Sequence, residues 1–584
     1  MKKRGLAAGL VLMAMVMAAG CGSPAKTETN ASQTTAEVTA ETTAAAISAA
    51  SGDTEDGAAV VTTAYGPVKG VQEGELLTWY GIPYGKAPVG ELRWQAPAAP
   101  DAWTEELNCT EASQPAIQLS GTEVKGSEDC LKLDVYAKEG SKKLPVLVFI
   151  HGGNNQTGKA GEIPGADLVK NDNCVYVSVD YRLGLLGFNC LPALTAGENG
   201  TGNFAMLDIA YALDWVKENI EAFGGDPDNI TISGFSAGGR DVMAMLISPH
   251  FKGKFQKAIA FSGGMTTAPE DLSGKKIAKA IAPLAVEDKK AADEDAAYQW
   301  LMTDAADVKE YLYSISAERL APLMGNAAIR MSVFPHLYQD GVVIPENGFD
   351  TTDYNSVPLM MLTGSSEFSM FCLGDGYFKS DDMAGYSEDE IKAAKAFASK
   401  YGSDMYRIFN AQESAVKMSD HYQSDIYICQ VNYGSEQSSI KDLGDYGAFH
   451  GIFVPMLSAK HNYLEFFPDA FGKTGYQAMA KQYNSYLANF LKSGDPNGEG
   501  LASWSSWTPD KKGSMVFDAT ENDAVVEEKD VTTTYQDIMA AMDQDTSVSP
   551  EIKDKMIKNV LNGRWFSSAL DEHYGNKSLW SDVK

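Results

Sequence analysis

Residues 214–239 decide the fold, and they read D-W-V-K-E-N-I-E-A-F-G-G-D-P-D-N-I-T-I-S-G-F-S-A-G-G. At the centre of this stretch, two glycines flank Ser236 in the pattern G-x-S-x-G. The apolar-rich run at 230–233 predicts a strand before the serine, and apolar residues at helical spacing over 242–246 predict a helix after it. A serine at such a strand-to-helix turn is typical of a nucleophile elbow.

The chemistry of this turn depends on its small residues. A Cβ at Gly234 or Gly238 would crowd the adjoining strand and helix, so glycine permits the sharp turn. The turn raises the hydroxyl of Ser236 above the sheet and leaves the N–H of Ala237 at a helix start, where it can stabilise negative charge. The alternative is a glycine-rich turn with an ordinary serine, because G-x-S-x-G also occurs by chance in many chains.

Size and charge limit the classes of function. The chain has 584 residues, of which 44% are hydrophobic and 22% charged, so it can bury the large core of a globular protein. Its formal net charge is −30. This charge excludes a general nucleic-acid binder, which needs basic patches to hold phosphates, and it disfavours attraction to anionic membranes or polyanionic substrates.

The N-terminus has the features of an export signal. Basic residues at 2–4 precede an apolar stretch over 6–19 that is too short to span a bilayer comfortably. Small residues before Cys21 resemble a bacterial lipoprotein signal. We therefore expect a signal peptide over 1–20 and a lipid on Cys21, which would anchor the protein in the bacterial cell envelope on the extracytoplasmic face of the membrane. Plain secretion with an incidental cysteine is the alternative.

Two further segments follow the signal. Residues 21–58 are rich in Ala, Thr, Ser and Glu and almost lack large apolar side chains, so they predict a disordered tether. One folded domain is expected over 59–584, and its last part, from about residue 530, has the pattern of a helical extension.

Continuous apolar runs alternate with helical patterns through the folded domain. The runs lie at 146–150, 175–179, 230–233, 257–261 and 357–362. Such strands predict an α/β protein with a mostly parallel sheet that is covered by helices on both faces. Catalytic groups are then expected in loops at the carboxyl ends of the strands.

Five further motifs accompany the Ser236 stretch. They are G-I-P-Y-G-K-A-P-V-G-E-L-R-W at 81–94, S-E-D-C-L-K-L-D-V-Y at 127–136, P-V-L-V-F-I-H-G-G at 145–153, Y-R-L-G-L-L-G-F at 181–188 and G-D-P-N at 494–497. In this order, over about residues 60–510, the chain resembles the type-B carboxylesterase, or cholinesterase-like, family of α/β-hydrolases. The resemblance implies an α/β-hydrolase fold with a large, mostly parallel central sheet flanked by helices.

The resemblance also implies a Ser-acid-His triad in that chain order, with Ser236 as the nucleophile. The acid of the family follows a strand, and Glu367 holds that position after the apolar run at 359–364. A surface glutamate without a role, or Asp375 as the acid, are the alternatives. Four histidines follow Glu367, and His450, in G-A-F-H-G, matches the histidine loop of the family.

Supporting roles come from the same resemblance. It assigns the oxyanion hole to backbone N–H groups of Gly153, Asn154 and Ala237, and it gives Ser262 a supporting hydrogen bond near the triad. Asn154 stands where the family has a third glycine. Because asparagine tolerates positive φ better than most residues, we expect its backbone donor to be kept. His151 is expected to hold this loop in place.

Two aromatic residues replace acids of the family. Phe235 stands where a glutamate usually precedes the nucleophile, and Phe453 stands where an acid commonly follows the histidine. The loop between Cys109 and Cys130 holds no Trp, where cholinesterases place a choline-binding ring. We therefore expect uncharged esters with apolar acyl or alcohol groups to be preferred over choline esters and anionic esters.

The family positions and the exported location imply a disulfide between Cys109 and Cys130. No Cys/His spacing indicates a metal site, and no cofactor is expected. The sequence thus predicts a serine carboxylesterase that acts on a small-molecule ester through an acyl-enzyme, with no nucleic-acid partner and with membrane contact only through the lipid anchor. A lipase-like hydrolase of longer acyl esters and a non-catalytic, cholinesterase-like binding protein are the alternatives, and the oligomeric state stays open.

Overall fold

The computed structural model describes residues 58–197, 200–325 and 334–583. The predicted signal peptide, Cys21 and all but the last residue of the predicted tether lie outside the described residues. None of the helices in the described ranges combines the length and the apolar character that a membrane span requires.

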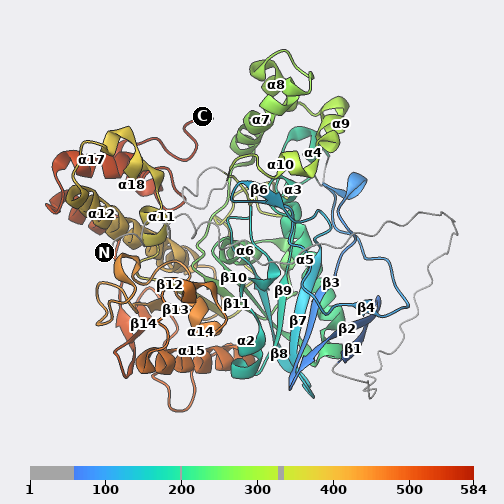
Figure 1. Ribbon diagram of the computed structural model, residues 1–584, viewed down its shortest axis with the longest axis horizontal. Helices are drawn as coiled ribbons and strands as arrows, with labels where there is room; N and C mark the ends of the chain where they lie inside the picture. Colours follow the sequence, from blue (N-terminus) through green and yellow to red (C-terminus); the bar gives the residue numbers. More distant parts are fainter. Residues whose placement is uncertain (1–57, 198–199, 326–333, 584) are drawn as a thin grey trace, which may run out of the picture.

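One mixed sheet of 13 strands forms the centre of the protein (Figure 1). Its parallel part runs, in spatial order, through β9 (Val175–Val179), β8 (Leu144–Ile150), β10 (Gly225–Phe235), β11 (Lys257–Phe261), β12 (Leu359–Gly364), β13 (Ile426–Val431) and β14 (Gly513–Ala519). The predicted α/β class with a large, mostly parallel central sheet is therefore confirmed. The five predicted apolar runs coincide with, or overlap, β8, β9, β10, β11 and β12, whereas β13 and β14 were not predicted.

Antiparallel strands extend both edges of the sheet. Beyond β9 follow β7 (Lys132–Lys138), β3 (Leu76–Pro83), β2 (Gly66–Glu73) and β1 (Ala58–Thr63), and beyond β14 follows β15 (Ala524–Asp530). The short β4 (Leu107–Asn108) pairs with β2, and β5 (Gln118–Ser120) forms a separate hairpin with β6 (Glu123–Lys125). These edge strands were not predicted, because their half-buried patterns lack the long apolar runs of the centre.

Strand β8 shows why the central strands are apolar throughout. Val146, Val148 and Ile150 belong to one core, which they share with α5 (Phe204–Asn219) and α6 (Ala237–Met245). Leu147 and Phe149 point to the opposite face and join the core under α15 (Thr474–Ser493). Because side chains alternate along a strand and both faces are covered, every position from Val146 to Ile150 is buried.

The remaining helices lie around the sheet. They are α2 (Ala166–Asp172), α3 (Gly184–Gly187), α4 (Pro192–Thr195), α7 (Glu270–Glu287), α8 (Glu294–Leu301), α9 (Ala306–Ser314), α10 (Ala317–Leu320), α11 (Ser369–Leu373), α12 (Glu388–Arg407), α13 (Glu413–Met418) and α14 (Val454–Leu457). The C-terminal extension forms α16 (Tyr535–Gln544), α17 (Pro550–Asn559) and α18 (Ser568–Tyr574). It shares an apolar core with α12, and Figure 1 shows these helices side by side. The extension is thus helical and packs against α12.

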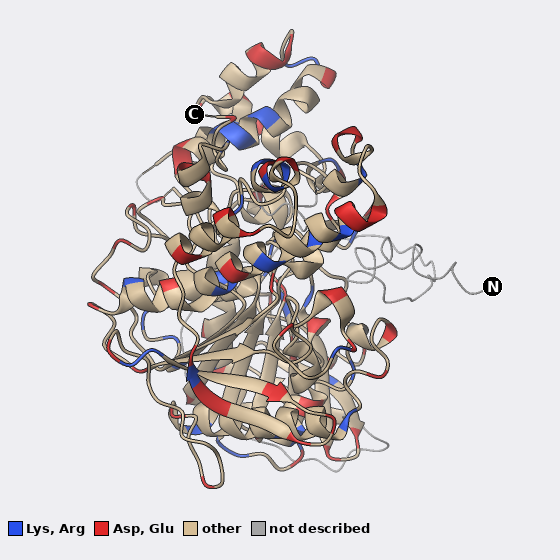
Figure 2. Cartoon of the chain, turned by 90° about the vertical axis from the view of Figure 1, so that its left-hand side faces the viewer, with Lys and Arg blue, Asp and Glu red and all other residues tan. Residues whose placement is uncertain are grey.

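The acidic residues are distributed over the surface. Figure 2 shows Asp and Glu on many helices and loops of one face, with Lys and Arg between them. The net charge therefore produces a diffuse potential on this face, which salt screens over a distance of about 10 Å.

Candidate active site

Ser236 lies at the turn between β10 and α6, as the nucleophile-elbow pattern predicts. Its φ is 56° and its ψ is −113°, a conformation that L-residues rarely adopt. A Cβ on Gly234 would lie 2.2 Å from the carbonyl oxygen of Gly238, and a Cβ on Gly238 would lie 2.1 Å from that of Ile150. Glycine is therefore required on both sides, because strand, turn and helix approach one another too closely for a side chain.

Glu367 follows β12 and is fully buried. Its Oε2 lies 2.6 Å from Nδ1 of His450. Its Oε1 accepts hydrogen bonds from the Ser262 hydroxyl at 2.6 Å, the Gly364 N–H at 2.6 Å and the Thr363 hydroxyl at 3.1 Å. One oxygen thus orients the histidine, while the other is held by three donors. The hydrogen bond predicted for Ser262 exists and is made to the candidate acid.

Aromatic rings enclose the imidazole of His450. Its ring centroid lies 4.8 Å from that of Phe235, 5.1 Å from that of Phe371 and 5.5 Å from that of Tyr406. Because Phe235 precedes Ser236, the contact with its ring places the imidazole beside the elbow. The Nε2 atom of His450 is buried and has no hydrogen-bond partner among the described residues. With Nδ1 donating to Glu367, Nε2 carries the lone pair and can accept a proton.

The candidate oxyanion loop follows β8. Gly153 has a φ of 99° and Asn154 a φ of 56°, so Asn154 adopts the left-handed conformation that a glycine would adopt easily. Among the described residues, no acceptor lies within hydrogen-bond distance of the backbone N–H groups of Gly153, Asn154 and Ala237. These three donors are therefore available to a ligand oxygen. The N–H of Gly152 donates instead to Oε2 of Glu162, at 2.8 Å.

His151 has a structural position. Its Nδ1 lies 2.9 Å from the carbonyl oxygen of Gly152, and its ring stacks on that of Tyr181 at 4.5 Å between centroids. Burial lowers the pKa of His151 to about 4, so the ring is neutral at ordinary pH. These contacts agree with its predicted role of holding the loop.

A polar network beside the oxyanion loop was not predicted. Nη2 of Arg240 donates to Oδ1 of Asn154 at 2.9 Å, and Nδ2 of Asn155 donates to Oδ1 of Asp241 at 2.8 Å. Burial, the largest effect, raises the pKa of Asp241 to about 7. A signal was present in the sequence, because Arg240 and Asp241 directly follow S-A-G-G, at the start of a helix that the elbow forces into the core.

Asp375, the alternative acid, lies in a different ion pair. It is buried and pairs with Arg564, with Oδ2 and Nη2 3.2 Å apart, whereas Glu367 contacts His450.

Phe453 packs against two other aromatic rings. It stacks on Phe261 at 4.3 Å between centroids and contacts the ring of Phe235 at 5.0 Å. The two positions that hold acids in the family thus form one apolar cluster under the imidazole.

The predicted disulfide is not formed. Cys109 and Cys130 are both buried free thiols, so this prediction is wrong for the structure. The Tyr80 N–H, in β3, donates to the carbonyl of Cys109, whereas the Tyr84 N–H, just after β3, donates to the carbonyl of Leu131, the residue after Cys130. The described residues also contain no group of three or more His, Cys, Asp or Glu side chains that could hold a metal ion.

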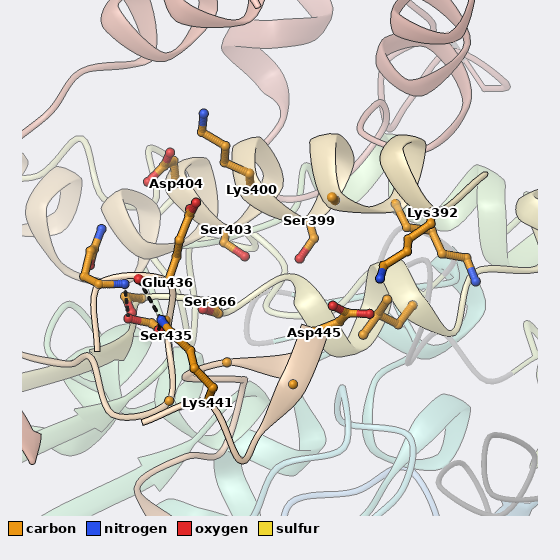
Figure 3. A pocket seen from close by; sticks show the side chains of 18 residues that line it. Ser366, Lys392, Ser399, Lys400, Ser403, Asp404, Ser435, Glu436, Lys441 and Asp445 are labelled. Atoms are coloured by element: carbon orange, nitrogen blue, oxygen red, sulfur yellow. Dashed lines mark hydrogen bonds between the residues drawn. The ribbon is translucent and has the colours of Figure 1, made fainter. Parts of the chain in front are cut away.

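A separate polar pocket lies on the α12 side of the candidate acid and histidine loops (Figure 3). Its volume is about 450 Å³, and Ser366 and Gly447, which flank Glu367 and His450 in sequence, line it. Lys392, Lys441 and Asp445 face it from α12 and from the loop after β13. None of Ser236, Glu367 and His450 lines this pocket.

Comparison with known proteins gives consistent matches. Residues 57–398 match the sequence model described as Carboxylesterase family. Para-nitrobenzyl esterase of Bacillus subtilis (strain 168) is 30% identical over 505 residues, which are 80% of this chain and 97% of that protein. Liver carboxylesterase of Sus scrofa is 30% identical over 76% of this chain and 87% of that protein. The crystal structure of the Geobacillus stearothermophilus carboxylesterase EST55 has a TM-score of 0.63 and 27% identity, over 82% of this chain and 99% of that one.

Proposed function

The chain belongs to the carboxylesterase family and is a carboxylic ester hydrolase, and on this basis we propose that it cleaves its esters with a Ser236–Glu367–His450 triad through an acyl-enzyme. The observation that carries the triad is the arrangement of His450. Its Nδ1 is held by Glu367, and its Nε2, beside the elbow, has no hydrogen-bond partner among the residues that the structure describes. Ser236 is the nucleophilic side chain at that elbow.

The proposed reaction has two steps. In the first, Ser236 Oγ forms a bond to the ester carbonyl carbon while His450 Nε2 takes the hydroxyl proton. The C–O bond to the alcohol then breaks, and the same proton goes to the leaving alkoxide. In the second, His450 takes a proton from water, the hydroxide attacks the acyl carbon, and the acid leaves as Ser236 regains its proton.

Charge on the carbonyl oxygen needs donors in both steps. The N–H groups of Gly153, Asn154 and Ala237 would supply them, since they donate to no acceptor among the described residues. The loss of one such donor costs about 2.7–4 kcal/mol of transition-state stabilisation. Three unused backbone donors, two in the loop after β8 and one at the elbow, also argue against the non-catalytic alternative.

The direct test of the triad is covalent labelling. A fluorophosphonate probe should label Ser236, and Ser236→Ala should abolish both labelling and ester hydrolysis. Labelling that persists at another residue in this variant would reject the assignment. A series of esters graded by acyl length separates the carboxylesterase from the lipase-like alternative.

The alcohol side of the substrate is proposed to be uncharged. Phe235 and Phe453 form an apolar cluster against His450, where relatives hold acids that would attract a cation. A neutral butyryl ester should therefore have a higher kcat/KM than butyrylcholine at high salt, where surface steering is screened. A clear preference for the choline ester would contradict this proposal.

The location proposed from the sequence is the extracytoplasmic face of the membrane, through a lipid on Cys21. Cys21→Ser should then release active enzyme from the membrane fraction. Unchanged retention in that fraction would require another anchor.

A further inference from the structure

Arg240 is a buried cation that forms no ion pair with a carboxylate of the described residues. Its side chain is only 6% exposed, and among the described residues no carboxylate oxygen lies within 4 Å of its guanidinium. Its Nη2 donates to the neutral amide oxygen of Asn154, and its Nη1 has no hydrogen-bond partner among the described residues. The next residue, Asp241, is bonded to Asn155 through one oxygen, and it interacts with the guanidinium through space without forming an ion pair within 4 Å.

Every other arginine in the described ranges has a carboxylate within 3.2 Å. The pairs are Arg93–Glu128, Arg182–Asp208, Arg319–Asp288, Arg407–Asp404 and Arg564–Asp375. The fully buried Arg182 and Arg564 are among the paired ones. Within the described chain, Arg240 is therefore the one arginine that lacks a direct ion pair. Its burial makes this costly, because a buried charge that is not hydrogen-bonded to a carboxylate is unfavourable.

The guanidinium lies close to the proposed catalytic groups. Arg240 follows Ser236 by one helical turn, and its N–H donates to the Ser236 carbonyl at 3.0 Å. Its partner Asn154 belongs to the candidate oxyanion loop. The guanidinium of Arg240 also interacts electrostatically with Tyr406, whose ring stacks on that of His450. Arg240 thus lies one helical turn after Ser236, and its guanidinium contacts the side chain of a residue in the candidate oxyanion loop.

Two neighbours of Arg240 also have unused polar atoms. The guanidinium lies over the Trp565 ring, with Cζ 5.6 Å from its centroid, and the buried indole Nε1 has no partner among the described residues. The ring of His336 lies 5.5 Å from that of Trp565, and its Nε2 also lacks a partner in the described part of the chain. Nδ1 of His336 lies 3.1 Å from the carbonyl oxygen of Phe334 and donates to it, so the neutral ring has its lone pair on Nε2.

This arrangement matches an anion. Arg240 Nη1 and Trp565 Nε1 offer N–H donors, and the guanidinium supplies the charge that a carboxylate oxygen requires. The lone pair of His336 suits a water or hydroxyl beside that carboxylate. Apolar acyl chains would leave all three atoms buried and unpaired.

We propose that Arg240 binds a carboxylate on the acyl part of the substrate, so that the preferred substrates are monoesters of short dicarboxylic acids. The inference rests on the proposed function, because it takes Ser236 as the nucleophile. It differs from the expectation that anionic esters are disfavoured, which came from the net charge of −30. The surface charge is diffuse and screened by salt, whereas a buried guanidinium acts at short range in a medium of low dielectric constant.

The test compares two esters of equal shape. Monoethyl glutarate and ethyl glutaramate differ only in a terminal carboxylate or carboxamide, and ethanol release measures both. The wild-type enzyme should favour the carboxylate by about 10- to 100-fold in kcat/KM, as expected for a charge-assisted hydrogen bond. The same ester and amide pairs made from succinate and adipate, which have a shorter and a longer chain, show which chain length gives the largest preference for the carboxylate.

Variants then identify the group responsible. Arg240→Met should abolish the preference, and Arg240→Lys should keep part of it. Arg319→Met removes a positive charge from α10 at the surface and should leave the preference unchanged. In the wild type, glutarate should also inhibit hydrolysis of a neutral ester more strongly than glutaramate, a measurement that does not depend on folding of the variants.

Two results would overturn the proposal. One is an equal or lower kcat/KM for the carboxylate ester in the wild type. The other is a loss in Arg240→Met that is the same for both esters, which would limit Arg240 to positioning Asn154. If instead neither ester is hydrolysed and Ser236 takes no fluorophosphonate, the proposed function itself fails.

Discussion

The Nδ1 atom of His450 lies 2.6 Å from Oε2 of Glu367. This contact places the ring proton on Nδ1 and leaves the lone pair of Nε2 available. The second oxygen of Glu367 is occupied by donors from Ser262, Thr363 and Gly364. The carboxylate therefore has little freedom to turn away, and the imidazole keeps the tautomer that a general base needs.

Substitution of Glu367 should have a much larger effect than loss of the Ser262 hydroxyl. Glu367→Gln places an amide among donors that need an acceptor, and it allows the wrong histidine tautomer, so kcat should fall by about 10³- to 10⁴-fold. Ser262→Ala removes one of three donors to Oε1 and should lower kcat by about tenfold. Steady-state kinetics on one neutral ester measure both. Glu436→Gln, in the separate polar pocket, is the control, and similar losses for Glu367→Gln and Ser262→Ala would contradict the ranking.

Glu162 should make stability depend on pH. Burial raises the pKa of Glu162 to about 7, whereas a glutamate in an unfolded chain has a pKa of about 4.3. Between these values the folded state binds more protons, so this group lowers the free energy of unfolding as pH rises. Glu162→Gln keeps an acceptor for Gly152 and removes the titration. Between pH 4.5 and about 7.5, the free energy of unfolding of Glu162→Gln should therefore rise by up to about 3 kcal/mol relative to that of the wild type.

Urea unfolding at about pH 5 and 7.5 measures this gain. The exposed Glu499→Gln serves as the control and should show no such difference. A gap between Glu162→Gln and the wild type that is equal at both pH values would mean that Glu162 does not titrate in this range.

Gly238 should tolerate no side chain. A Cβ there would lie 2.1 Å from the carbonyl oxygen of Ile150 and 2.7 Å from that of His151, and backbone atoms cannot move aside easily. Gly238→Ala should therefore cost about 3 kcal/mol of stability and most of the activity. Gly472→Ala is the matched control, since nothing lies within 4 Å of its added Cβ. Equal unfolding midpoints for the two variants would argue against the tight elbow.

Reduction should not change the stability of the protein. Cys109 and Cys130 are free thiols, whereas a disulfide between them would contribute about 3 kcal/mol. The midpoint of urea unfolding should be the same with and without a reducing agent. Thiol counting in denaturant, without reduction, should find both cysteines reactive. A lower midpoint after reduction would show that a disulfide forms.

The strands of the sheet centre could be predicted because their signal is local. Residues 175–179 and 257–261 are apolar throughout, and they coincide with β9 and β11. Edge strands such as β1 and β15 could not be predicted in the same way, because one face of each is open and its residues alternate less clearly. The disulfide prediction, which came from the family positions and the expected export, failed because neither of these fixes the distance between two thiols in space.

The sequence by itself determined the family, the α/β class and the candidate triad, because each depends on short motifs whose chemistry is local. Only the tertiary structure decided which side chains surround those motifs. Arg240 and Asn154 are 86 positions apart in sequence, and their contact exists because β8 and β10 are parallel neighbours whose carboxyl ends meet. That Arg240 forms no ion pair with a carboxylate in the described part of the chain is likewise a property of its buried surroundings, since burial and pairing arise only when distant segments pack together.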